Sequence, residues 1–347
     1  MPADGRPFPR LRLSPTSLFT LAFFCAGVAV AYAGSTRIPS ELGQYYFYDY
    51  WFEGDVPRAV GNLTDRRWLL PRASLHPLYS LTLAPAGLFL TKVIGLTAWD
   101  AATLISTAGA GLLTGLFFLV ARRMSGRTLD ASVATLALMA SSAFLFWTAV
   151  PETFVWSAAS ILAVLFVIGL PRQRPPSLLF VAASAAALGV TITNWSIALV
   201  TAAVSCSRRR ALVLSVAAFA IVAALGVVST NVFPNSDRFM RLTGEAEYLN
   251  RGAGSWMRVP PAFFVSAIVA PVPTTIARGT ISDKVEDQRS MQRPDWLAQR
   301  PLMLGAAALW LAAFGVGAGT LVRRLTTQRA DRVTLTLAFA VGSQFIL

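Results

Sequence analysis

Cysteine and histidine are scarce in this chain, and their scarcity excludes two kinds of site. Of its 347 residues only two are cysteines, Cys25 and Cys206, and only one is a histidine, His76. Both cysteines lie in or at the end of apolar runs, far from each other in the sequence. The chain therefore predicts neither a disulfide framework nor a zinc site.

Charged residues are also few, at 14% of the chain, whereas hydrophobic residues make up 55% and the mean hydropathy is +0.57. The apolar runs approach the length of about 20 residues that a helix needs to span a bilayer. We therefore expect an all-α fold, a polytopic transmembrane helix bundle. The net charge of +13 does not indicate a nucleic-acid partner, because the basic residues form short clusters between apolar runs and no nucleic-acid module is recognisable.

Basic residues ahead of the first apolar run predict the orientation of the chain, because cytoplasmic flanks are enriched in Lys and Arg. Arg6, Arg10 and Arg12 precede the run at 17–34, which places the N-terminus in the cytoplasm of a multi-pass protein of the plasma or inner membrane. A signal peptide is the alternative, since residues 31–33 resemble a cleavage site. Under both readings the loop that follows emerges on the outer face.

The segment at 78–94 decides how the later spans are oriented. Pro85 and Lys92 are both costly in a lipid-exposed span, and a crossing here would carry the arginines at 122–127 to the outer face. We therefore expect this segment to lie in the interface or to form a re-entrant hairpin, within a long outer first loop at 35–98 that carries interfacial helices. Later spans are expected at 101–121, 131–149, 154–170, 211–230 and 303–322, with a tight hairpin over 177–205 whose tip lies near 191–195.

A second outer loop is expected at 231–302, and the whole chain, 1–347, is interpreted as a single membrane domain. Its last apolar run stops at Leu347 after about 15 residues, which is short of a full span. We therefore expect a chain that is truncated at its C-terminus, and an inactive fragment of a membrane enzyme stays among the interpretations.

The first outer loop contains the sharpest chemical feature of the sequence, Glu53-Gly54-Asp55. Two carboxylates separated by one glycine can converge on a cation, or leave one acid with a raised pKa that suits a general base. Together with phosphate oxygens, such carboxylates suit Mg or Mn. The alternative is a solvated interfacial loop whose charges simply face water.

Four further residues are candidates for the same outer surface. Arg58 could bind phosphate or hold a carboxylate in place, and His76 could contact a phosphate or a carboxylate, or cap a helix. Glu152 stands between two expected spans, and a charged residue near membrane depth marks a site by default; Pro151 is expected to end the helix before it. Asn194, at the tip of the expected hairpin, would contribute to the same surface.

These features resemble the GT-C class of integral-membrane glycosyltransferases, which includes the protein mannosyltransferases, the aminoarabinose transferases and the lipopolysaccharide-core transferases. The resemblance covers roughly residues 10–210 and rests on three motifs: Glu53-Gly54-Asp55, His76-Pro77-Leu78-Tyr79 and Pro151-Glu152-Thr153. It implies that Asp55 is the acid of the first loop, which activates the acceptor hydroxyl or guides the leaving phosphate. Glu152 would be the second acid, although aspartate is common at that position in the class.

The first hypothesis is therefore a transferase that moves a sugar from a polyprenyl-phosphate carrier to a hydroxyl of a lipid, glycan or protein at the outer face of the bilayer. Its catalytic acids and metal ligands would be Glu53, Asp55 and Glu152, and its substrate-binding residues Arg58, His76 and Asn194. The second hypothesis is a non-catalytic membrane protein, a transporter or an assembly partner. Transporters usually carry ionisable groups near the bilayer midplane and show repeat symmetry, whereas the spans expected here are nearly free of charge.

Overall fold

The computed structural model describes residues 14–38, 56–68, 74–170 and 175–236, together with scattered positions between 308 and 336. All the elements in these residues are helical, which confirms the all-α class for the described part of the chain. Three of them, α1, α4 and α10, are long and apolar enough to cross a membrane. The elements in order are α1 (Pro15–Ser35), α2 (Val56–Thr64), α3 (Tyr79–Lys92), α4 (Ala98–Ser125), α5 (Thr128–Ala140), α6 (Ser142–Trp147), α7 (Phe154–Ile168), α8 (Ser177–Val190), the 3₁₀ helix η2 (Ile192–Asn194), α9 (Trp195–Ser205) and α10 (Arg208–Val232).

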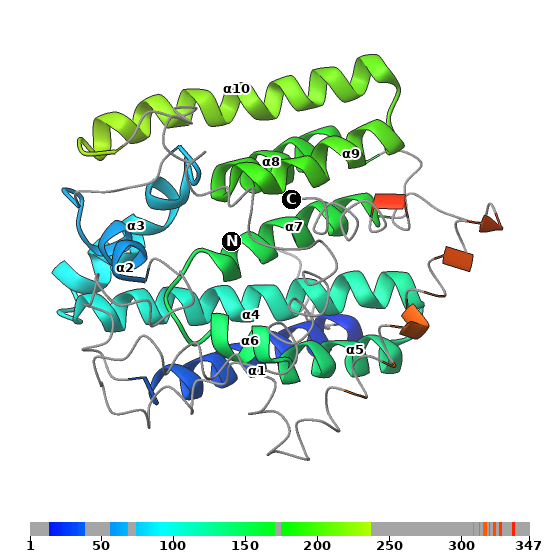
Figure 1. The fold of residues 1–347 in the computed structure, drawn as a ribbon, viewed down its shortest axis with the longest axis horizontal. Helices are drawn as coiled ribbons and strands as arrows, with labels where there is room; N and C mark the ends of the chain where they lie inside the picture. The colour runs from blue at the N-terminus through cyan, green and yellow to red at the C-terminus, as the bar shows by residue number, and fades with distance from the viewer. Residues whose placement is uncertain are drawn as a thin grey trace, which may run out of the picture.

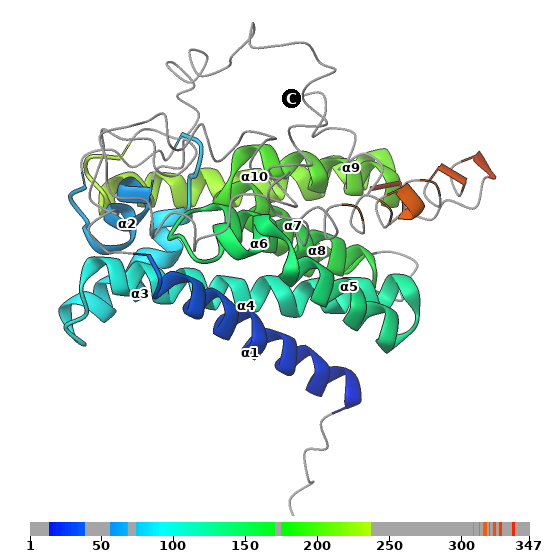
Figure 2. The same ribbon diagram turned by 60° about the horizontal axis from the view of Figure 1, so that its bottom comes forward.

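The helices pack in succession from α1 through α4, α7 and α8 to α10, with α4 in the interior and α10 on the opposite side from α1 (Figure 1, Figure 2). Local chemistry explains where α4 begins and ends. The hydroxyl of Thr97 accepts a hydrogen bond from the backbone N–H of Asp100 (3.1 Å), as a helix N-cap does. At the other end Gly126 adopts a left-handed backbone (φ 72°), which glycine permits at little cost.

Small residues allow α1 and α4 to approach closely, and we call this contact the α1–α4 seam. A Cβ atom at Gly27 would lie 2.3 Å from the hydroxyl of Thr114, and one at Gly111 would lie 2.9 Å from the carbonyl of Phe24. The Thr114 hydroxyl also donates to the carbonyl of Phe23 across the seam (2.8 Å). Close packing of this kind is what holds helices together in a bilayer, where burial of apolar surface gives no net driving force.

The expectation of one continuous span at 131–149 is wrong, because two separate helices, α5 and α6, occupy this segment. Ser141 between them has an extended backbone (ψ 146°), and its hydroxyl accepts from the N–H of Phe144 (3.2 Å) and caps α6. The expectation that Pro151 ends this helix is also wrong. The helix α6 ends at Trp147, and the hydroxyl of Thr148 donates to the carbonyl of Phe144 (2.7 Å) at its last turn.

The helix α3 begins and ends beside α2. Its first residue, Tyr79, shares an apolar cluster with Leu63 of α2, and its last residue, Lys92, lines a cavity together with α2. Midway, a Cβ atom at Gly87 would lie only 2.0 Å from the carbonyl of Leu63, so glycine is required for the two helices to cross. With 14 residues against the 28 of α4, α3 does not run the length of the bundle.

The bundle has two ends of different character. The α2 end contains α2, the start of α3, the connection between α6 and α7 and the end of α10 (Figure 1), and hydrogen bonds place η2 there as well. Direct contacts join these segments: Val56 packs with Val150, the backbone N–H of Ile192 donates to the carbonyl of Leu75 (3.0 Å), and a side-chain nitrogen of Arg66 donates to the carbonyl of Val232.

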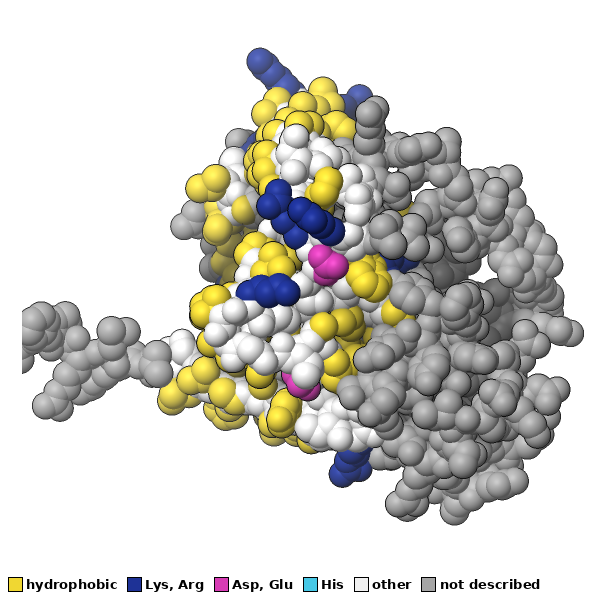
Figure 3. All heavy atoms as spheres, turned by 90° about the vertical axis from the view of Figure 1, so that its left-hand side faces the viewer, with side chains coloured by type: hydrophobic (Ala, Val, Ile, Leu, Met, Phe, Trp, Pro, Cys, Tyr) yellow, Lys and Arg dark blue, Asp and Glu magenta, His cyan; other side chains and the backbone are white. Residues whose placement is uncertain are grey.

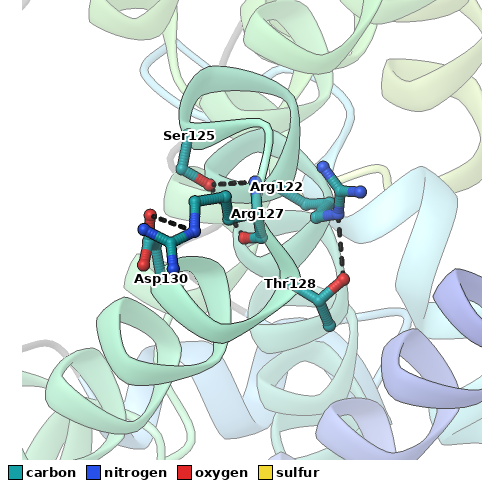
Figure 4. A network of polar contacts seen from close by, with 5 residues as sticks. All are labelled: Arg122, Ser125, Arg127, Thr128 and Asp130. Atoms are coloured by element: carbon teal, nitrogen blue, oxygen red, sulfur yellow. Dashed lines mark hydrogen bonds and ion pairs between the residues drawn. The ribbon is translucent and has the colours of Figure 1, made fainter.

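The arginine end lies opposite and contains Arg122, Arg123, Arg127 and the run 208–210. Figure 4 shows its α4–α5 turn, in which the Nε of Arg122 donates to the hydroxyl of Thr128 (3.0 Å) and Arg127 pairs with Asp130 (3.9 Å). Arg123 donates to the carbonyl of Gly169 (2.8 Å), just after α7, and Arg210 donates to the carbonyl of Pro175 (2.9 Å), just before α8. The starts of α8 and α10 therefore meet at this end, which confirms the hairpin expected over 177–205, with η2 at its tip.

Candidate functional site

The short segment just before α3 contains His76 and is hydrogen-bonded to the end of α8. The backbone N–H of Leu78 donates to the carbonyl of Gly189 (2.7 Å), and that of Ile192 donates to the carbonyl of Leu75 (3.0 Å). A Cβ atom at Gly189 would lie 2.8 Å from the side chain of Leu78, so glycine allows this close approach. The two hydrogen bonds hold His76 against the end of α8.

His76 begins a chain of hydrogen bonds that runs across α8 to α7. Its Nδ1 lies 2.8 Å from the carbonyl of Val190 and 3.2 Å from the hydroxyl of Thr191. Since a carbonyl only accepts, Nδ1 carries the hydrogen, and the bond fixes the orientation of the ring. The chain continues from the hydroxyl of Ser157, which donates to that of Thr191 (3.3 Å).

Asn194 completes this chain from η2. Its Nδ2 donates to the hydroxyl of Ser157 (2.6 Å), to the carbonyl of the same residue (3.1 Å) and to the hydroxyl of Ser160 (3.1 Å). The side chain is buried, as a polar group in a protein interior can be when it is hydrogen-bonded. His76, Thr191, Ser157 and Asn194 thus form one connected network at the α2 end.

An acid and a phenol lie beside this network. Glu152 is only 3% exposed, in the connection that leads into α7, and its carboxylate accepts from the N–H of Thr153. Tyr79 is 1% exposed, and its hydroxyl has no hydrogen-bond partner within the described part of the chain. Burial raises the pKa of Tyr79, and the negative charge of nearby Glu152 raises this pKa further. The phenol therefore stays protonated and can donate a hydrogen bond to an oxygen atom of a bound molecule.

Together these six residues are called the polar cluster: His76, Tyr79, Glu152, Ser157, Thr191 and Asn194. The helix α2 adds two more buried polar side chains at the same end of the bundle, Arg58 and Asn62, which are four residues apart and so share one face of the helix. The Oδ1 of Asn62 has no hydrogen-bond partner among the described residues.

Four of the six predicted site residues fall in the described part of the chain. His76 and Asn194 are brought into one hydrogen-bonded network, Glu152 lies next to Tyr79, and Arg58 is buried on α2. Glu53 and Asp55 lie outside the described residues. Within those residues no group of three His, Cys, Asp or Glu side chains could hold a metal ion, so the predicted Mg or Mn site stays a prediction.

Sequence reasoning assigned no role to Tyr79, Ser157 or Thr191. Tyr79 was visible as the last residue of the motif that begins at His76, but a tyrosine there is equally typical of a membrane interface. Ser157 and Thr191 gave no signal, because single hydroxyl residues in apolar helices usually bond to their own backbone.

The chain matches no protein-family model, no curated protein and no solved structure.

Proposed function

We propose that the chain is a polytopic membrane glycosyltransferase that moves a sugar from a polyprenyl-phosphate carrier to a hydroxyl acceptor at the outer face of the bilayer. The observation that carries the proposal is the buried carboxylate of Glu152 near the phenol of Tyr79, which has no hydrogen-bond partner in the described part of the chain. Buried ionisable groups are costly in a membrane protein and mark sites by default.

The connection between α2 and the α6–α7 segment supports a site that both acids share. Val56, which follows Asp55 in the sequence, is completely buried and packs with Ala149 and Val150. Glu152 stands two residues beyond Val150. The first residue of α2 and the segment that leads to Glu152 therefore belong to one apolar cluster. Asp55 directly precedes Val56 in the sequence, which supports the proposal that the two acids act at one site.

The proposed chemistry is an inverting transfer. Asp55 takes the proton of the acceptor hydroxyl as its oxygen attacks the anomeric carbon, and the carrier phosphate leaves with the electron pair of the broken C–O bond. Arg58 and His76 bind and neutralise that phosphate, while Asn194 and Tyr79 position polar groups of the sugar. A Mg or Mn ion held by Glu53, Asp55 and Glu152 would add further positive charge beside the phosphate.

The sidedness of the protein forms part of the proposal: the α2 end faces outward and the arginine end faces the cytoplasm. Single cysteines test it in a background that lacks Cys25 and Cys206. Asp65→Cys, on the exposed turn after α2, should react with an impermeant thiol reagent added outside intact cells, whereas Ser125→Cys and Ser207→Cys should be protected. Labelling of the two serine positions alone would reverse the orientation and remove the outer-face site.

The transfer itself is tested in proteoliposomes that contain the purified chain, a polyprenyl-phosphate sugar and an acceptor extract. Asp55→Asn and Glu152→Gln should each lower the transfer rate by about a hundredfold or more, because the first removes the base and the second the buried charge beside Tyr79. Asp130→Asn, at the arginine end, is the matched control and should keep the wild-type rate. Equal transfer by Asp55→Asn and wild type would exclude the mechanism.

A further inference from the structure

A cavity of about 590 Å³ lies beside α2, next to the C-terminal end of α3 and the start of α4. Its volume falls in the range of about 300–1,000 Å³ that is usual for pockets that bind small molecules. One wall comes from α2 and the turn after it, and the other comes from the α3–α4 connection. None of the residues of the polar cluster lines it. The lining residues are Pro57, Val60, Gly61, Thr64, Asp65 and Trp68 on the first wall, and Thr91, Lys92, Leu96 and Ala98 on the second.

The first wall is held in place by contacts that do not involve a ligand. The ring of Trp68 lies directly on Gly61, where a Cβ atom would come within 2.2 Å of it, so only glycine allows the ring this position. Asp65 closes the turn by accepting from the N–H of Arg67 (2.8 Å). The same turn is tied to α10, because Asn235 donates to the carbonyl of Arg67 (2.7 Å). The indole and the carboxylate are therefore presented to the cavity on a fixed backbone.

Opposite charges face this cavity from its two walls. Lys92 lies at the end of α3, and Asp65 lies on the turn after α2. Among the described residues, these two side chains form no ion pair with each other. Figure 3 shows this end of the molecule, where basic and acidic side chains lie among hydrophobic ones. A positive and a negative side chain on opposite walls of a cavity are electrostatically complementary to a ligand that carries one negative and one positive group.

The position of the cavity also restricts the ligand. Ala98, which lines it, is the first residue of the candidate span α4, and the turn that carries Trp68 is bonded to Val232, the last residue of the candidate span α10. If these helices cross the bilayer, the cavity lies at the level of the lipid headgroups, just outside the hydrocarbon core.

We propose that this cavity binds the headgroup of a zwitterionic phospholipid. The ammonium of Lys92 binds the phosphate, and the ligand's own ammonium group lies between the carboxylate of Asp65 and the ring of Trp68, where an aromatic face and an anion both attract a cation. The apolar residues Val60 and Leu96 contact the glycerol region. This site is independent of the sugar transfer proposed above.

Other ligands fit the two walls less well. A neutral sugar would leave both charges without a partner, and a sugar phosphate would bind Lys92 but gain nothing from the negative charge of Asp65. An anionic lipid such as phosphatidylglycerol would likewise lie against Asp65 without a compensating cation. The charge pattern therefore selects for phosphatidylethanolamine or phosphatidylcholine.

Native mass spectrometry of the full chain tests the proposal, with protein released from nanodiscs of equal parts phosphatidylethanolamine, phosphatidylcholine and phosphatidylglycerol. Wild type should retain a zwitterionic lipid in preference to phosphatidylglycerol. Lys92→Gln, which removes the phosphate contact, should lower retention of the zwitterionic lipids about tenfold, and Asp65→Asn should lower their preference over phosphatidylglycerol about tenfold, as loss of one hydrogen bond to a charged group implies. Asp65→Lys should reverse the preference in favour of phosphatidylglycerol. Both side chains are exposed, so these variants should fold, and thermal unfolding checks that they do.

Arg209→Gln and Asp130→Asn change one charge each at the arginine end and should leave the preference unchanged. Equal retention of all three lipids by wild type would overturn the proposal, as would unchanged lipid retention in Lys92→Gln or an unchanged preference in Asp65→Asn. Displacement of the retained lipid by glucose 1-phosphate would also overturn it and would assign the cavity to a sugar phosphate. Loss of transfer activity in Asp55→Asn bears on the proposed function alone and leaves the lipid preference as it is.

Discussion

Two contacts between helices in this bundle are built on opposite principles. The α1–α4 seam combines glycines that allow close approach with phenylalanine rings that stack across it, and one threonine hydroxyl donates across it to a backbone carbonyl. The contact of α7 with α8 and η2 contains Ser157, Thr191 and Asn194, joined to His76 by hydrogen bonds. The first contact gains stability mainly from close packing. The second places polar groups in an apolar bundle, which costs free energy unless every group is paired.

The two contacts differ in how far packing alone explains the residues they contain. Apolar packing and one hydrogen bond account for the contact of α1 with α4. The polar cluster is different, because a buried phenol that has no hydrogen-bond partner in the described part of the chain lowers stability. Features of this kind are retained when a ligand or a reaction uses them.

The largest effect is expected from adding one methyl group to the α1–α4 seam. Gly27→Ala should lower the free energy of unfolding by about 3 kcal/mol. The new Cβ atom would lie 2.8 Å from the backbone carbonyl of Ala110, and no side-chain rotation can relieve this clash. Unfolding in mixed micelles measures it. Gly115→Ala is the matched control: its Cβ finds ordinary contacts at 3.6 Å, so stability should stay equal or rise. Equal losses in the two variants would refute the account of the seam.

An intermediate effect is expected in the polar contact. Asn194→Ala removes the donor to Ser157 and Ser160 and leaves their oxygens less well paired, so the free energy of unfolding should fall by about 2 kcal/mol. Asn231→Ala, in which the exposed side chain donates only to a backbone carbonyl of its own helix, should change stability by less than about 0.5 kcal/mol. If both variants unfold alike, the network does not stabilise the contact.

The smallest effect has the opposite sign. Tyr79→Phe removes a buried hydroxyl that has no partner in the described part of the chain and should raise the free energy of unfolding by about 1 kcal/mol at neutral pH. If the proposed function holds, the same variant should transfer sugar more slowly. Tyr32→Phe, at an exposed position on α1, should leave both quantities unchanged. Reduced stability in Tyr79→Phe would show that the hydroxyl has a structural partner.

The pH dependence of stability sharpens this test. The pKa of Tyr79 is higher in the folded chain than in the unfolded chain, so above about pH 10 the unfolded state loses this proton while the folded state keeps it. Wild type should therefore lose stability as the pH rises beyond that value, and Tyr79→Phe should lose less. Parallel stability curves for the two proteins would mean that the environment of Tyr79 does not raise its pKa.

Part of the fold was predictable because the relevant signals are local. Runs of apolar residues located α1, α4, α7 and α10. Pro85 and Lys92 led to the expectation of an interfacial or re-entrant segment at 78–94, which stays a prediction; α3 is not among the three spanning candidates. The division at Ser141 was not predicted, because the composition of the run at 131–149 stays apolar across it. A single extended residue with a capping hydroxyl interrupts the helix there without any change in hydropathy.

The sequence by itself determined that this is a helical protein of membrane composition, and it located a histidine, a glutamate and an asparagine that lie at one end of the bundle. Hydropathy and motif position suffice for this, because they depend on residues that are close in the chain. Only the tertiary structure decided that His76 reaches Thr191 and that Ser157 faces Asn194, since these partners are 115 and 37 residues apart. The rotation of each helix about its axis selects which hydroxyl meets which amide, and that rotation is set by the packing of all its neighbours.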